Sequence, residues 1–489
     1  MPSSLPPSQT IDDTFAHIRA WLRFETSASP GRPHPEQRRR RRDSNSGSDY
    51  LQDVLGEGAS PKRRKEEDDD DIAPDQSVSH TGSVVELNDR TTLSSFGAGS
   101  KRSTSPIRQK TLLRTARPPI LQDPLSNPSI PIPADVAPRL LALRQRLRRR
   151  LTSRFIPACL RTVLEKEPAF QTALVHEPID DDAYDESDER PAEYFALAVD
   201  RAKAVLQGTQ LCTTYNKDEN AWCFDVVIPL LDLALMLYGR DTFRRESVQS
   251  QSIQPAYLPR AVDPSLRTER YLFRKIDYCF CYSHLHPKYA AFYGRLQNAA
   301  ISHMTDNFTQ AAALFSGIEV KPPNGGAVEA QVQISIWMAA SLRKKADLAR
   351  CAMSAKRNVP SLDEAVDVAS ASARATSPSN RPPDLSDLSA LIEPGVTIIG
   401  PEHKVYYAFL STPIIPDDPG SGTVSVLGHD ERLPLLTTQT VQGVFQLARL
   451  YGNIFEYGMD ESGEGFWGAF LGPVLEGVAR AGEKVVALR

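Results

Sequence analysis

The chain has 489 residues, of which 40% are hydrophobic and 24% charged, and its formal net charge at pH 7 is −4. This length allows one large domain or two ordinary ones, and the near balance of charge predicts no partner by itself. The 6 cysteines form no disulfide framework. No signal peptide and no uninterrupted apolar run of about 18 residues is present, which argues against a secreted or membrane-spanning protein. We therefore expect an intracellular protein with no membrane partner.

Residues 1–110 are rich in Ser, Pro, Arg, Asp and Glu, and we predict a long disordered N-terminal region there. Within it, Ile11–Phe24 has the apolar spacing of a short docking helix. Arg38–Arg42 and Pro61–Lys65 are basic clusters, and the second is followed directly by the acidic run Glu66–Asp71. Such clusters are typical of nuclear localisation signals, so the expected location is the nucleus, otherwise the cytoplasm. The alternative is a charged tail that only keeps the chain in solution.

Residues 135–189 are predicted to form a basic helical lead-in followed by an acidic linker, Asp180–Glu189. One face of the helix is apolar, and its other faces carry arginines. The apolar stripe consists of Leu140, Leu143, Leu147 and Leu151, and the arginines are Arg139, Arg144, Arg146, Arg148, Arg149, Arg150 and Arg154. Two interpretations stay open: a helix packed on the domain with a solvated basic face, and a helix that faces phosphates.

Residues 190–353 are predicted to form the first part of a folded core. Helical periodicity covers Glu193–Leu206 and Glu219–Leu237, the second interrupted by Pro229. Tyr271–Tyr282 alternates as a strand, and a long helical stretch is predicted over Ala290–Leu314. A buried strand, a Pro/Gly turn and a helix then follow within Leu314–Trp337.

Residues 354–388 have low complexity and are predicted to be a disordered insert. The core resumes over residues 389–460 with two β-rich runs, Gly395–Ile399 and Lys404–Leu410, joined by a hairpin turn. The helix Thr440–Tyr457 closes the domain, and residues 461–489 form a C-terminal extension. Strands placed among helices predict an α/β fold, with a central mixed β-sheet flanked by helices.

Glu319 and Lys321 are the strongest candidates for chemistry. On an extended strand they share one face, while Ile318 and Val320 point to the other. Charge beside an apolar strand needs a function or a partner. With Asp277 from the preceding strand, the set suits phosphodiester hydrolysis, in which two carboxylates hold Mg²⁺ or Mn²⁺ and a lysine orients a water. We therefore predict Asp277, Glu319 and Lys321 as catalytic residues.

Two further residues could complete such a site. Glu219 heads a helix face that is otherwise apolar, and Gln333 lies one turn before Trp337 on its helix. For each of them a structural interpretation is at least as strong. Glu219 is favoured in a first turn by the helix dipole, and Gln333 suits a partly exposed position.

Other motifs give weaker signals. Glu402-His403-Lys404 repeats the same triplet spacing but begins in a predicted turn, so its glutamate is expected to be solvated. Cys279, Cys281, His284 and His286 suggest zinc, but the spacing is wrong for the usual pairs, and small buried hydrophobes explain the two cysteines better. No P-loop, zinc-protease or esterase motif is present.

Four short elements in order resemble a group of fungal proteins that carry a PD-(D/E)XK nuclease-like domain. They are Glu219–Trp222, Lys275–Tyr278, Gly317–Lys321 and Gln333–Trp337. The resemblance covers roughly residues 190–460 and implies a restriction-endonuclease-like α/β core. It also implies that Asp277 and Glu319 are metal ligands, that Lys321 orients the water, and that Glu219 is an auxiliary acid and metal ligand. Gln333 would be the polar residue of the helix after the catalytic strand.

Two departures from the family pattern stand out. Ile276 occupies the position of the proline in the superfamily name, and Glu319 lies 42 positions after Asp277. The expected function is still metal-dependent hydrolysis of nucleic acid, DNA rather than RNA. The alternatives are a catalytically silent nuclease-fold module that binds nucleic acid or a protein in the nucleus, and a nuclear scaffold protein.

Overall fold

The computed structural model describes residues 84–86 and 106–487, apart from 192–194, 240, 264–267, 298, 358–386 and 413–420. The described residues all belong to one compact unit, Val78–Arg489. The helix predicted over Ile11–Phe24, both basic clusters and most of the predicted disordered segments lie outside the described residues. The nuclear location therefore stays a prediction.

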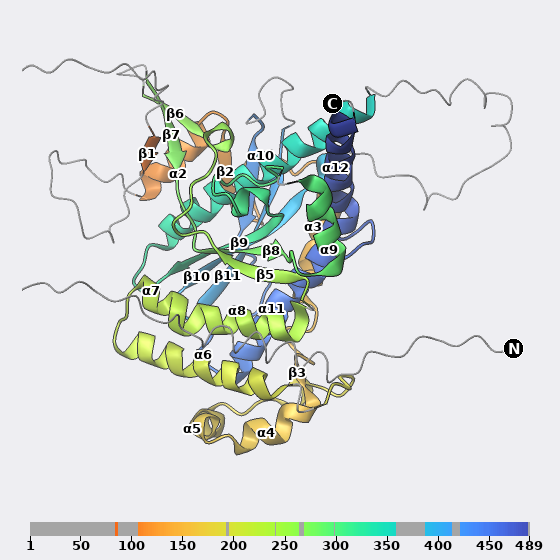
Figure 1. Ribbon diagram of the computed structural model, residues 1–489. Coiled ribbons are helices and arrows are strands. Elements are labelled where there is room, and N and C mark those ends of the chain that lie inside the picture. Colours follow the sequence, from red (N-terminus) through yellow and green to blue (C-terminus); the bar gives the residue numbers. More distant parts are fainter. Residues whose placement is uncertain are drawn as a thin grey trace, which may run out of the picture. The chain divides into compact units, whose positions relative to one another are not determined.

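The central element is a seven-stranded mixed sheet in the order β2-β12-β11-β10-β9-β8-β5 (Figure 1). Its strands are β2 (Ile120–Asp123), β5 (Phe243–Ser247), β8 (Tyr278–Tyr282), β9 (Leu314–Lys321), β10 (Ile392–Ile399), β11 (Glu402–Leu410) and β12 (Val424–Gly428). β9 and β10 are parallel, as are β12 and β2, and the other neighbours are antiparallel. Two small sheets accompany it, one of β1 (Val84–Glu86), β7 (Thr268–Phe273) and β6 (Arg260–Asp263), the other of β3 (Ile156–Pro157) and β4 (Tyr184–Asp185).

Helices cover both faces of this sheet, as the sequence predicted. In Figure 1, α10 crosses one side of the sheet, and α8 and α6 form successive layers on the other. The longer helices are α2 (Pro106–Thr115), α3 (Val136–Arg148), α5 (Pro168–His176), α6 (Ala196–Thr214), α9 (Pro287–Leu296), α10 (Ala327–Arg357), α11 (Val441–Met459) and α12 (Gly472–Ala487). The shorter ones are α4 (Arg161–Lys166), α7 (Glu219–Trp222) and α8 (Ile228–Ala234).

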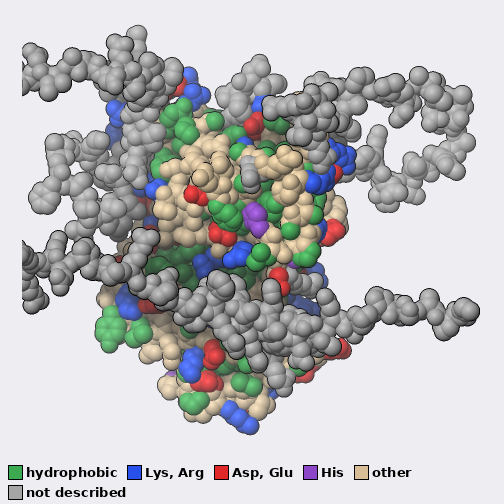
Figure 2. Space-filling view, viewed as in Figure 1, with side chains coloured by type: hydrophobic (Ala, Val, Ile, Leu, Met, Phe, Trp, Pro, Cys, Tyr) green, Lys and Arg blue, Asp and Glu red, His purple; other side chains and the backbone are tan. Residues whose placement is uncertain are grey.

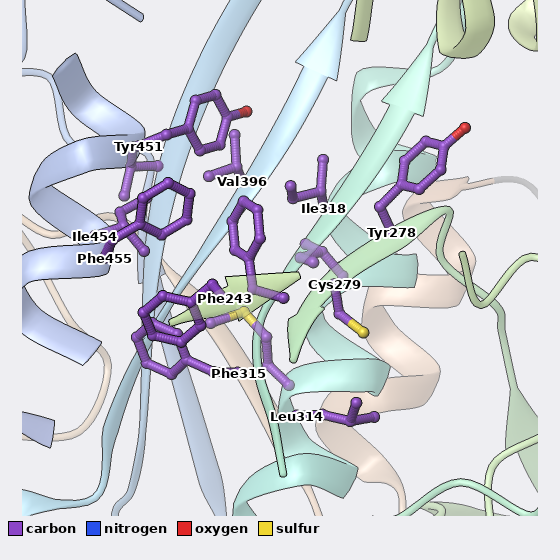
Figure 3. Close-up of a cluster of buried hydrophobic side chains, with 14 of the residues drawn as sticks. Phe243, Tyr278, Cys279, Leu314, Phe315, Ile318, Val396, Tyr451, Ile454 and Phe455 are labelled. Carbon is purple, nitrogen blue, oxygen red and sulfur yellow. The ribbon is translucent and has the colours of Figure 1, made fainter. Parts of the chain in front are cut away.

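Aromatic side chains join α11 to the sheet (Figure 3). The Phe455 ring lies 4.7 Å from that of Phe280 and 5.4 Å from that of Phe243, and Phe243 stacks on Phe315 at 5.8 Å. Ring pairs at these distances add stability beyond their buried area. α11 (Val441–Met459) confirms the helix predicted over Thr440–Tyr457. Thr440 is its N-cap and accepts the Gly443 N–H at 2.9 Å.

The strand predicted over Tyr271–Tyr282 is wrong as one element. β7 ends at Phe273 and belongs to the small sheet, and β8 begins at Tyr278 in the central sheet. Residues 274–277 join the two sheets, and the buried Arg274 lies there. Asp277 therefore comes just before a strand, at the edge of the central sheet.

The long helix predicted over Ala290–Leu314 is also wrong. α9 ends at Leu296, because Gln297 adopts a left-handed backbone conformation with φ of 49°. The chain then runs through irregular structure to β9, which begins at Leu314. Apolar residues of this stretch, such as Ile301 and Met304, are buried without helical structure, which explains the misleading periodicity.

The segment Glu219–Gly239 is helical throughout, but wider π turns interrupt it at Cys223–Val227 and Leu235–Gly239. Pro229 follows the first π turn, where a proline that lacks an N–H is tolerated. By length and composition this segment could cross a membrane. It packs against α6 and α11, and a core helix of this kind can have the same length and apolar composition as a membrane span.

Two buried histidines predict how stability depends on pH. Burial lowers the pKa of His403 to about 3 and that of His303 well below its usual range. Between the folded and unfolded pKa values the unfolded chain binds the extra proton, so each histidine costs stability as pH falls below about 6.5. Denaturant unfolding at several pH values should show wild type losing about 1.4 kcal/mol per pH unit relative to His403→Gln in this range. Parallel pH profiles for the two proteins would contradict the assignment.

Candidate active site

Glu319 and Lys321 lie at the end of β9, the strand that the sequence predicted. All eight residues of this strand are buried, including Glu319 at 1% and Lys321 at 3% exposure. The Lys321 ammonium lies 2.9 Å from Glu319 Oε1. The two side chains therefore share one face, as their spacing of two residues requires.

Asp277 is held in place by two hydrogen bonds to its carboxylate. Val320 donates its backbone N–H to Oδ2 at 2.7 Å, and Gln249 donates its side-chain amide to Oδ1 at 2.7 Å. The Asp277 N–H in turn donates to the Ile318 carbonyl at 3.2 Å. Asp277 is thus fixed directly to the strand that carries Glu319 and Lys321.

Glu219 reaches the same place from the first turn of α7. Asp218 caps that helix by accepting the Ala221 N–H at 2.9 Å, which fixes where the helix begins. Glu219 Oε2 lies 2.8 Å from the Lys321 ammonium, and its side chain is 21% exposed. The helix dipole therefore favours Glu219 in this turn, but the residue also belongs to the polar cluster.

The carboxylates of Glu219, Asp277 and Glu319 converge, each offering one oxygen within 4.8 Å of the others. In the part of the chain that the structure describes, this is the one such group of acidic, histidine or cysteine side chains. Burial raises the pKa of Glu319 well above its usual range, against the effect of Lys321. Apart from the ion pair with Lys321, neither Glu319 oxygen has a partner among the described residues.

Gln333 comes close to the cluster from α10. It donates to the Lys275 carbonyl at 3.1 Å, and its amide oxygen is buried without a hydrogen bond to any described residue. The close approach of α10 to β9 depends on Gly317, because an added Cβ would lie 2.7 Å from the Trp337 ring. Gln333 therefore steadies the segment before Asp277, and the structure shows no direct contact with the three carboxylates.

These residues suit a divalent cation. Three carboxylates face one ammonium, so two formal negative charges are left in a largely buried site, which is costly without a counter-ion. The donor atoms are all oxygens, the ligands that Mg²⁺ and Mn²⁺ prefer. The Glu319 carboxylate fits this use, because apart from the Lys321 ammonium it has no partner among the described residues that a metal would have to displace.

Access to the cluster is from the side of α7. Glu219 is its most exposed member, and Pro323 and Asn324, just after β9, are exposed. Figure 2, in the same view as Figure 1, shows a recess along the sheet above α7 and α8, with Lys and Arg side chains in it. The cluster thus lies directly beneath the surface at this edge of the sheet.

Sequence reasoning missed Gln249 and Cys223. Gln249 holds Asp277 and lies 3.6 Å from the Cys223 sulfur. Burial, followed by the charge of Asp277, raises the pKa of the Cys223 thiol, which therefore stays protonated. Gln249 lies in Ser247–Ser252, a run that is polar apart from Val248, with no periodicity or motif that could have singled it out.

The weaker motifs form no comparable site among the described residues. Lys404 pairs with Glu402 at 3.4 Å. The Lys404 side chain is 32% exposed and the Glu402 side chain 47%. Cys279 and Cys281 are buried in β8 and join no group that could hold a metal. The predicted preference for buried thiols over zinc ligands agrees with this placement.

One comparison with known proteins gives a match. The sequence model of a family described as the PD-(D/E)XK nuclease superfamily matches residues 169–463, more than half of the chain. No curated protein and no solved structure is significantly similar to the chain. The matched region contains every residue of the acidic cluster, together with Lys321 and Gln333.

Proposed function

Because the chain belongs to the PD-(D/E)XK nuclease superfamily, we propose that it is a metal-dependent nuclease that hydrolyses phosphodiester bonds of nucleic acid. The observation that carries the proposal is the convergence of Glu219, Asp277 and Glu319 around Lys321. These residues come from three separate segments of the chain. A structural role alone does not explain two buried carboxylates and one partly buried carboxylate beside one buried ammonium.

Asp277, Glu319 and Glu219 would hold Mg²⁺ or Mn²⁺, and the bound ion would lower the pKa of a water and neutralise phosphate charge. The chain's own residues do the positioning. The hydrogen bonds from Gln249 and Val320 fix the Asp277 carboxylate, so it needs no rearrangement when a ligand arrives. Lys321 supplies the positive charge that orients the attacking water and stabilises the negative charge that develops on the phosphate.

Glu219 has a second role in this proposal. It pairs with Lys321 on the exposed side of the cluster, at the place where a phosphate would enter. A phosphodiester that approaches Lys321 competes with Glu219 for its ammonium. Substrate binding therefore separates Glu219 from Lys321, and the Lys321 ammonium then pairs with the phosphate instead of with Glu219.

DNA is the proposed substrate, and the direct test is a cleavage assay. The purified full chain is incubated with plasmid DNA and with single-stranded DNA, in Mg²⁺ or Mn²⁺ and then in EDTA. We expect cleavage with either metal and none in EDTA. No cleavage of any substrate, together with tight, salt-sensitive binding, would favour a catalytically silent module that binds nucleic acid.

A further inference from the structure

The arginines of α3 fall into two groups in the structure. Arg144 forms two hydrogen bonds to the Asp430 carboxylate, both at 2.9 Å, and Arg146 lies 2.6 Å from Asp460. These ion pairs attach the helix to the domain, as the first of the two sequence interpretations expects. Arg148 and Arg149, at the end of the helix, form no ion pair with any described residue, and both are exposed.

Arg148 and Arg149 line a pocket of about 470 Å³ together with Arg432. Arg432 follows β12 in the chain, and its guanidinium also forms no ion pair with a described residue. The rest of the lining is polar or apolar and carries no acidic side chain: Gln145, Leu151, Thr152, Leu433 and Pro434. Three arginines therefore line one open pocket, and none of its lining residues is acidic.

The helix dipole does not account for this arrangement. Cations at a helix C-terminus are favoured, which would explain Arg148 and Arg149 on α3. Arg432 belongs to a different segment, and its charge repels the other two unless an anion lies between them. Arginine is the side chain best suited to bind phosphate oxygens, because its donors match them in pairs.

The pocket is connected to the cluster around Lys321. The segment that carries Arg432 continues to Leu436 and Thr438, which bond to the start of β11: the Leu436 carbonyl accepts the His403 N–H, and the Thr438 N–H donates to the Pro401 carbonyl. The adjoining Gly400 N–H donates to the Lys321 carbonyl at 2.7 Å. The pocket segment is thus anchored to the edge of the sheet at which β9 ends.

We propose that Arg148, Arg149 and Arg432 form a phosphate-binding pocket that holds the nucleic-acid backbone away from the cleavage site. This proposal rests on the proposed function, because the ligand is the backbone of the strand that the acidic cluster would cut. The pocket recognises phosphate and no base, so it contributes affinity without sequence preference. Free phosphate compounds share the same chemistry, and the experiment separates the two sources.

The test measures binding in EDTA, where no metal-dependent cleavage occurs. Fluorescence anisotropy of a labelled DNA duplex is followed as the full-length chain is added, at several salt concentrations. The triple variant Arg148→Gln/Arg149→Gln/Arg432→Gln should bind at least about tenfold more weakly, with a slope of log affinity against log salt smaller by about 2 to 3. Unlabelled pyrophosphate serves as the competing free phosphate compound.

A control variant removes the same charge elsewhere: Arg139→Gln/Arg161→Gln/Arg480→Gln changes three arginines outside the pocket. It should keep both the affinity and the salt slope of wild type. Equal binding by the two triple variants would overturn the proposal, as would displacement of DNA by pyrophosphate at equal phosphate concentration, which would indicate a site for small phosphate compounds. Failure of the nuclease proposal is distinguishable, because an inactive chain would still show the difference in binding.

Discussion

Replacing Lys321 by alanine is expected to reduce metal-dependent cleavage by at least about 100-fold, because the change removes the positive charge closest to the developing negative charge. Lys321 lies between Glu219 and Glu319, at 2.8 and 2.9 Å, and is almost fully buried. Initial rates on plasmid DNA at saturating Mg²⁺ or Mn²⁺ give the measurement. The loss should appear mainly in kcat, because the charge that Lys321 stabilises develops in the transition state, with a smaller rise in KM because the bound phosphodiester also contacts the ammonium.

Folding of the variant needs a separate check. Removing one partner of a buried ion pair costs about 3–5 kcal/mol when the other charge has no alternative. Lys321→Met is the companion variant, because it keeps most of the side-chain volume and removes only the ammonium. If both variants fold, as judged by circular dichroism and thermal unfolding, and cleave at wild-type rates, the role of Lys321 is refuted.

The chain provides a matched control for this experiment. Lys404 belongs to the second triplet of the same spacing, Glu402-His403-Lys404, but its side chain is partly exposed, at 32%, and pairs with Glu402 at 3.4 Å. Lys404→Ala should therefore leave cleavage within about twofold of wild type, because surface ion pairs contribute little. A large loss of cleavage in Lys404→Ala would indicate that the second triplet takes part in catalysis, and it would contradict the proposed site.

The second large effect concerns the metal. Glu319→Gln is expected to remove most of the stabilisation that Mn²⁺ or Mg²⁺ gives the protein. A ligand present at 100 times its Kd stabilises the folded state by about 2.7 kcal/mol, and a 100-fold loss of affinity reduces this to about 0.4 kcal/mol. Thermal unfolding with and without the metal measures the difference, and this readout does not depend on catalysis.

Without metal, the same variant should be at least as stable as wild type. Glu319 is buried, and its partner among the described residues is the Lys321 ammonium, which keeps Glu219 as a second partner when Glu319 is replaced. Burial also raises the pKa of Glu319. A neutral amide at this position avoids the cost of burying that charge. Glu402→Gln is the control, since the exposed glutamate of the second triplet should change neither stability nor the response to metal.

An equal metal-induced shift in the unfolding temperature of Glu319→Gln and wild type would remove Glu319 from the proposed ligand set.

The same experiment on Asp277→Asn tests the two roles of Asp277, its charge and its anchoring hydrogen bonds. Asp277 accepts hydrogen bonds from Gln249 and Val320, so its replacement disturbs the anchoring as well as the charge. Its effect on metal-free stability should therefore be unfavourable, in contrast to that of Glu319→Gln.

The residues of the candidate site could be predicted from the sequence to different degrees. Glu319 and Lys321 stand on an apolar strand at a spacing of two, so local geometry alone puts them on one face. Asp277 was placed in a continuous strand that the structure divides, and only its pairing with β9 brings it to the cluster. For Glu219 and Gln333 the sequence left a structural role equally open.

The tertiary structure places Glu219 and Gln333 differently relative to the cluster. Glu219 contacts Lys321 because Asp218 fixes the first turn of α7 beside the end of β9. Gln333 bonds to the Lys275 carbonyl instead of reaching the carboxylates. Gln249, which holds Asp277, has no sequence signal at all, because its importance comes from a contact between residues 28 positions apart.

The sequence by itself determined the class of fold, the strand that carries Glu319 and Lys321, the β10–β11 hairpin and the helix α11. Hydrophobic periodicity is a local property, and it fixes an element wherever one face of that element is buried. Only the tertiary structure decided where the strand before Asp277 breaks, where α9 ends, and which arginines of α3 are paired with acids. These features depend on contacts between distant segments, which periodicity within one segment does not encode.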